Sequence, residues 1–141
     1  MATISEDYCS YEVAKLLNEK NFQVDTDKDY WKIGEDGTMY FMCSIGAYTS
    51  DPNNKNAFYR PASSYPCPTQ SMAMKWLREV HNLCIEPYRT ASGYLYTISK
   101  IWTGSEIYSD EFNGDDEDSG QWTTYEKACE AAIKYCLKNL I

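Results

Sequence analysis

The residues of this chain that could bind a metal ion lie in an acidic stretch near its C-terminal end. Five of them fall at positions 1, 3, 5, 6 and 12 of a twelve-residue window that resembles an EF-hand calcium loop: Asp115, Glu117, Ser119, Gly120 and Glu126. The match is partial, because position 3 carries Glu instead of Asp or Asn and the preceding residues lack the pattern of an entering helix. The sequence therefore leaves two interpretations open. One is a calcium or other metal site in the loop 110–126 that uses Asp115, Glu117, Ser119 and Glu126, and the other is a solvated loop.

The same stretch supports a further interpretation that depends on charge alone. Seven of the 21 acidic residues lie between Glu106 and Asp118. Such a concentration of negative charge could face a basic surface on a partner protein, and binding of this kind weakens as salt concentration rises.

Acid–base or nucleophilic catalysis would have to use the single histidine, His81, together with a cysteine. Cys84 lies three residues away, but Leu83 and Ile85 flank it and predict that its side chain is buried. His81 falls at the end of a predicted helix, where an interaction with the helix dipole accounts for it. One His–Cys pair also lacks the second pair that a zinc site needs. The sequence thus favours a protein that is not an enzyme and predicts no cofactor other than calcium.

The long segment from Gly46 to Pro68 is the best candidate for a binding surface. It carries four of the five prolines and has no periodicity of its own, and connections of this length are often functional. Three of its aromatic residues, Phe58, Tyr59 and Tyr65, are the predicted binding residues. The alternative is an ordered segment that packs over the core.

The amino-acid composition makes some classes of binding partner unfavourable. The 141 residues include 13 basic and 21 acidic side chains, for a net charge of −8. Nucleic-acid backbones and anionic membranes repel such a chain, so we expect neither as a partner. The chain shows no signal peptide and no long apolar run, which predicts a cytoplasmic protein. Its six cysteines, none in a CxxC pair, are then expected to be reduced and mostly buried.

Apolar periodicity predicts the elements that position these residues. Three helices are expected near 10–20, 69–81 and 123–140, with Ser10, Thr69 and Thr123 as N-caps and Glu126 completing a capping box with Thr123. The predicted strands cover 30–33, 38–45, 83–86 (stopped by Pro87), 94–103 and 107–108. Residues 1–9 show no pattern. We therefore predict a single globular domain over residues 1–141 of the α+β class, with an antiparallel sheet of three to five strands packed against about three helices.

Three segments, one in each predicted helix, also resemble sequences of a known protein family. The stretches Ser10–Leu17 (SYEVAKLL), Pro68–His81 (PTQSMAMKWLREVH) and Tyr125–Ala128 (YEKA) resemble, in this order, a family of short hypothetical proteins from tailed bacteriophages and prophages. That family has no assigned activity, so the resemblance implies an origin and not a mechanism. Together with the charge and the aromatic content, it leads us to expect a phage-type accessory protein in the host cytoplasm that binds a host or phage protein.

Overall fold

The computed structural model describes residues 4–24, 26–33, 38–43, 64–109 and 122–141, and the statements below concern these residues. The chain divides into two compact units. The first contains Met1–Asp7 and Thr69–Ile141, and the second contains Tyr8–Pro68. A single globular domain over residues 1–141 stays a prediction.

The first unit contains two α-helices that begin at threonine caps. Helix α2 covers Gln70–His81, and the hydroxyl of Thr69 accepts a hydrogen bond from the Met72 amide at 3.2 Å. Asn82 ends this helix in the left-handed conformation, with φ of 58°. Helix α3 covers Tyr125–Tyr135 and continues as a π-helical turn, η1, over Cys136–Leu140. The helix predicted at 69–81 is confirmed.

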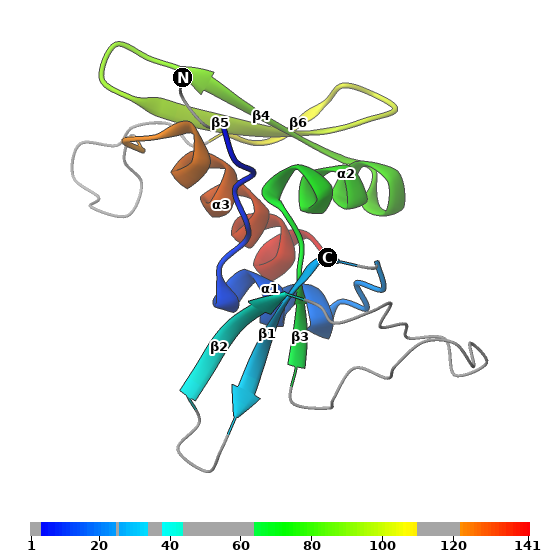
Figure 1. Ribbon diagram of the computed structural model, residues 1–141. Coiled ribbons are helices and arrows are strands. Elements are labelled where there is room, and N and C mark those ends of the chain that lie inside the picture. The colour runs from blue at the N-terminus through cyan, green and yellow to red at the C-terminus, as the bar shows by residue number, and fades with distance from the viewer. Residues whose placement is uncertain (1–3, 25, 34–37, 44–63, 110–121) are drawn as a thin grey trace. The chain divides into compact units, whose positions relative to one another are not determined.

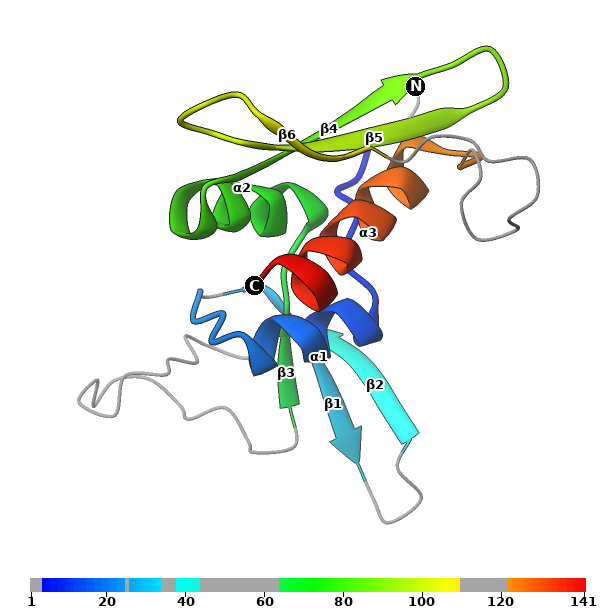
Figure 2. The ribbon, with the colours of Figure 1, turned by 180° about the vertical axis from the view of Figure 1, so that it is seen from behind.

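These helices pack on an antiparallel sheet. Its strands are β4 (Leu83–Arg89), β5 (Tyr94–Lys100) and β6 (Glu106–Ser109), in the order β4-β5-β6. Both views of the ribbon place α2 and α3 on the same face of this sheet (Figures 1 and 2). Ile85 and Ile98 are opposite each other in the register and both are buried. From the helices, the core receives mainly Ala73, Leu77, Ala132, Ile133 and Leu137.

The strand boundaries differ from the prediction, most at the C-terminal ends of β4 and β5. β4 continues through Pro87, where the sequence predicts a stop, because β4 is an edge strand and an edge strand tolerates a residue without an N–H. β5 ends at Lys100 instead of Thr103. Residues 101–103 form a turn, which Gly104 completes with φ of 65°.

The ends of the last helix also differ from the prediction. The N-cap is Thr124, whose hydroxyl accepts a hydrogen bond from the Lys127 amide at 3.1 Å, so the capping box of Thr123 with Glu126 is wrong. Thr123 instead accepts a hydrogen bond from the Lys127 ammonium group at 3.2 Å. Two adjacent threonines offer the same capping chemistry, so the sequence alone does not distinguish between them. At the other end, the α-helix stops at Tyr135, and the wider π turn keeps both Cys136 and Leu137 buried.

The second unit contains one helix and a second antiparallel sheet. Helix α1 covers Tyr11–Glu19, and its cap is the predicted Ser10, which accepts a hydrogen bond from the Val13 amide at 3.3 Å. Strands β1 (Lys28–Ile33), β2 (Thr38–Cys43) and β3 (Ser64–Cys67) form a sheet in the order β2-β1-β3. Helix α1 packs against β3, with Val13, Ala14, Leu17 and Cys67 buried.

The α+β class is confirmed, with helices packed on antiparallel sheets. The strands form two three-stranded sheets where the sequence predicts one sheet. The difference arises partly from β3, a four-residue strand that contains Pro66 within the segment expected to have no regular structure. No described helix is long and apolar enough to cross a membrane.

Candidate binding pocket

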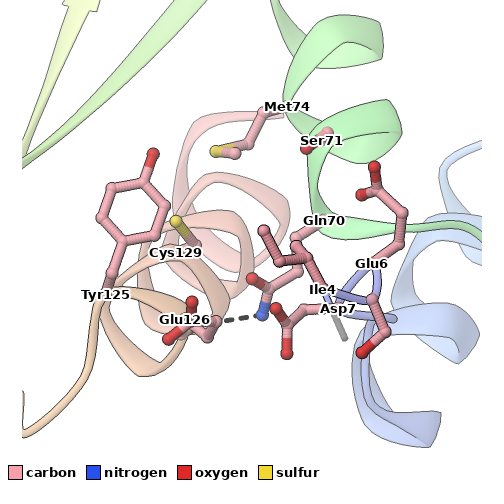
Figure 3. A pocket seen from close by; sticks show the side chains of 10 residues that line it. Ile4, Glu6, Asp7, Gln70, Ser71, Met74, Tyr125, Glu126 and Cys129 are labelled. Carbon is pink, nitrogen blue, oxygen red and sulfur yellow. Dashed lines mark hydrogen bonds between the residues drawn. The ribbon is translucent and has the colours of Figure 1, made fainter. Parts of the chain in front are cut away.

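The first unit contains a pocket of about 290 Å³ that three segments enclose. The segment Ile4–Asp7 forms one wall, the N-terminal half of α2 forms a second and the start of α3 forms the third (Figure 3). Helix α2 contributes Gln70, Ser71 and Met74, and helix α3 contributes Tyr125, Glu126 and Cys129.

Gln70 holds these three walls together. Its side chain is 8% exposed, and its Nε2 donates to the backbone oxygen of Glu126 at 3.0 Å and to the Glu130 carboxylate at 3.3 Å. Its backbone N–H donates to the Asp7 carbonyl at 2.8 Å. One residue therefore fixes the N-terminal segment and the start of α3 against α2, so the pocket is largely formed before any ligand enters.

The charge of the pocket has one sign. Glu6, Asp7 and Glu126 line it, and no lysine, arginine or histidine is among the described residues of its wall. Glu6 and Asp7 are exposed and Glu126 is partly buried, so their carboxylates keep contact with water. Three carboxylates around one cavity favour a cationic group over a neutral or anionic one.

The apolar part of the wall is also compatible with a cation. Tyr125 is 44% exposed and presents its ring to the cavity near the sulfur atoms of Cys129 and Met74 (Figure 3). Aromatic faces attract ammonium and guanidinium groups, and the alkyl stem of a lysine or arginine packs well on thioether and aromatic surfaces. The pocket can therefore receive the stem and the charged end of one long basic side chain.

The other two titratable groups in the described wall, the Tyr125 hydroxyl and the Cys129 thiol, are protonated at neutral pH. Burial, with an additional contribution from Cys129, raises the pKa of the Tyr125 hydroxyl. Burial also raises the pKa of the Cys129 thiol from 9.0 to about 11, and its hydrogen bond with Tyr125 offsets only part of this change. A nucleophilic cysteine needs a lowered pKa, so this thiol contributes to shape and not to covalent chemistry.

Of the four predicted metal ligands, the structure places only Glu126. It lies in the first turn of α3, lines the pocket and accepts the Gln70 hydrogen bond through its backbone oxygen. Asp115, Glu117 and Ser119 lie outside the described residues. Within the described part of the chain, no group of three or more His, Cys, Asp or Glu side chains is arranged to hold a metal ion. The calcium site stays a prediction.

Of the three predicted aromatic binding residues, the structure places only Tyr65. It lies on β3, is partly buried, and its ring meets that of Tyr11 edge to face at 5.8 Å between centroids. Tyr65 therefore contributes to the packing of α1 on the second sheet. Phe58 and Tyr59 lie outside the described residues.

Neither His81 nor Cys84 is fully buried, and the surroundings of the Cys84 thiol do not activate it as a nucleophile. The His81 ring meets the Trp76 ring edge to face at 4.6 Å. The predicted burial of Cys84 is wrong, because strand alternation turns it to the face opposite Leu83 and Ile85, where it is partly exposed. Its thiol lies 3.9 Å from the Glu86 carboxylate, and burial followed by that charge raises its pKa.

Most of this pocket could not be predicted from the sequence. Residues 1–9 show no pattern, yet Ile4–Asp7 form a wall, because a long-range contact with Gln70 holds them there. A weak signal was available in the spacing of four between Gln70 and Met74 and between Tyr125 and Cys129, which places each pair on one helix face.

Comparisons of the chain with protein-family models, with curated proteins and with solved structures found no match. The function of the candidate pocket must therefore be inferred from the geometry and charge of the pocket itself.

Proposed function

We propose that this chain is a non-enzymatic accessory protein of phage or prophage type that binds another protein in the host cytoplasm. In this proposal, its acidic pocket receives a lysine or arginine side chain from the partner. The phage origin depends on the resemblance of the helix sequences alone. The observation that carries the binding mode is the set of three carboxylates around a preformed cavity with no basic residue in its described wall.

A basic side chain satisfies each part of this wall. Its charged end can contact Glu6, Asp7 and Glu126, with the two-pronged geometry of a guanidinium group suited to paired carboxylate oxygens. Its alkyl stem can lie against Tyr125 and Met74. The net charge of −8 adds attraction at longer range for a basic partner and repels nucleic acid.

The test is an affinity pull-down from lysate of a bacterial host with mass spectrometry of the retained proteins, at low and moderate salt. The wild type is compared with a triple variant, Glu6→Gln, Asp7→Asn and Glu126→Gln. A control variant, Glu19→Gln, Glu79→Gln and Glu106→Gln, removes the same charge from exposed positions that do not line the pocket.

We expect the wild type and the control variant to enrich the same protein, and the pocket variant to lose it. Binding should also weaken as salt rises, because exposed ion pairs are screened within about 10 Å at 0.1 M salt. Equal retention by all three baits would contradict the proposal, and so would retention of no protein by a folded wild type.

A further inference from the structure

A second and larger hollow, of about 540 Å³, lies elsewhere in the first unit. It is formed where α2 ends, where β5 turns toward β6 and where η1 ends. Its apolar wall consists of Leu83, Ile107, Leu140 and Trp102. The wall also contains His81, Asn82, Lys100 and Thr103, but apolar atoms make up most of its surface, which is typical of a small-molecule site.

Trp102 is exposed but held in place. It is 83% exposed, and its indole N–H donates to the Asn82 side-chain oxygen at 3.0 Å. The backbone beneath it is equally fixed, since the Ile101 amide donates to the Asn82 carbonyl at 3.0 Å and the Gly104 amide to the Lys100 carbonyl at 2.8 Å. The Trp102 ring is exposed to water and already fixed in position, so it can cover a bound ligand with little loss of side-chain entropy.

Other exposed apolar side chains extend this surface. Ile107, in the wall itself, is 36% exposed, and Ile101, next to Trp102 in the chain, is 39% exposed. Apolar groups gathered around one hollow mark a place where a ligand can remove them from water.

The charge at this hollow is opposite to that of the acidic pocket. Lys100 lines it, and among its described wall residues there is no aspartate or glutamate. A bound carboxylate would therefore meet an ammonium group and no competing carboxylate of the wall, while an apolar chain or ring attached to it fills the space against Leu83, Ile107 and Leu140.

From this complementarity we propose that the hollow beside Trp102 binds a small amphipathic monoanion, an apolar chain or ring that carries one carboxylate. The site shares no residue with the acidic pocket. The inference therefore goes beyond the proposed function, and an experiment can contradict either one without contradicting the other.

The experiment uses the full chain labelled with ¹⁵N and three probes with the same alkyl chain: octanoate, 1-octanol and octylammonium. The readouts are the indole N–H resonance of Trp102, which is assigned by its disappearance in Trp102→Phe, and the backbone amide resonances of Leu83, Thr103 and Ile107, which every variant retains. The test variants are Lys100→Gln and Trp102→Ala, both at exposed positions, and Lys15→Gln in α1 is the matched control.

We expect octanoate to bind saturably and to shift the Trp102 indole, with about five-fold higher affinity than 1-octanol. Lys100→Gln should reduce the affinity for octanoate to the level of the alcohol and leave the alcohol unchanged. Trp102→Ala should weaken both, and Lys15→Gln neither. The proposal is overturned by equal binding of octanoate and octanol, by preferred binding of octylammonium, by an equal loss in Lys15→Gln or by shifts that do not saturate.

Discussion

Gln70 is a buried polar side chain in the wall of the acidic pocket, and its burial is tolerated because both hydrogens of its amide nitrogen have acceptors. Its Nε2 reaches both the backbone and a side chain of α3, and its main chain reaches Asp7. A buried polar group of this kind stabilises the fold only while its partners are present. The geometry of the acidic pocket therefore depends on one amide.

Replacing this amide tests that dependence. Gln70→Ala should lower the free energy of unfolding by about 1–3 kcal/mol, because the Glu126 carbonyl and the Glu130 carboxylate lose a buried donor. The measurement is urea denaturation followed by circular dichroism. Gln23→Ala, at an exposed position, is the control and should change the value by less than about 0.5 kcal/mol. Equal effects of the two substitutions would show that the amide has no structural role.

The buried thiols should make the free energy of unfolding fall as the pH rises into the alkaline range. Burial raises the pKa of Cys136 from 9.0 to about 12, whereas the unfolded chain keeps the ordinary value. The folded state therefore retains a proton that the unfolded state loses above about pH 9. The resulting stabilisation is complete below pH 9 and is lost progressively between pH 9 and pH 12, at up to about 1.4 kcal/mol per pH unit.

Urea denaturation at pH 8, 9.5 and 10.5 should show this loss in the wild type. In Cys136→Ala the free energy of unfolding should fall less steeply over the same range, although it starts lower because a buried atom is missing. Cys84→Ala, at a partly exposed position, should follow the wild type more closely. Parallel curves for the wild type and Cys136→Ala would rule out this thiol as the source.

At the scale of elements, the start of α3 gives a direct comparison between neighbouring threonines. Thr124→Ala should cost about 1 kcal/mol of stability, because the Lys127 amide loses its hydroxyl acceptor. Thr123→Ala should cost less than about 0.5 kcal/mol, since its hydroxyl accepts a hydrogen bond from the exposed Lys127 ammonium group and caps no backbone amide among the described residues. The measurement is again denaturation by urea. A larger cost at Thr123 would favour the capping box that the sequence predicts.

Elements with local signals could be predicted from the sequence, and elements that depend on distant partners could not. Helix α2 was predicted with its cap because its apolar stripe, Thr69 and the stop near Asn82 all lie within one segment. Strand β3 and the continuation of β4 through Pro87 were missed, because only the neighbouring strands decide whether a proline fits.

The same distinction applies to the two pockets. Lys100 and Trp102 are near each other in the sequence, but Leu140 reaches the hollow only through the fold. The acidic pocket combines residues from positions 4–7, 70–74 and 125–129. No spacing rule joins segments so far apart in the chain. The charge composition therefore predicted the sign of the partner's charge but not the place where the partner binds.

At the scale of the whole molecule, the calcium interpretation can be separated from the protein-binding proposal by one measurement. If the chain acts only as a protein-binding module, its melting temperature should be the same in millimolar calcium and in EDTA. A calcium site occupied at 100 times its dissociation constant would add about 2.7 kcal/mol and raise the melting temperature by several degrees. Loss of such a rise in Asp115→Asn, which changes no described residue of the acidic pocket, would assign it to the predicted loop.

The path of the chain between its two units has a consequence for their independence. The chain leaves the first unit after Asp7 and returns at Thr69, and the Asp7 carbonyl accepts a hydrogen bond from the Gln70 amide at 2.8 Å. Within the second unit, the Cys9 amide donates to the Pro68 carbonyl at 3.0 Å. The second unit thus has the topology of an insertion whose two ends meet.

Insertions of this kind can be exchanged or removed at little entropic cost to the host unit, because the ends to be rejoined are already adjacent. A chain in which Asp7 is joined to Thr69 through two glycines should therefore fold, and its amide NMR spectrum should be well dispersed. A collapsed spectrum would show that the first unit requires residues 8–68. If the shortened chain folds, the stretch between Asp7 and Thr69 is the natural place for related proteins to gain, lose or replace a module without rebuilding either pocket.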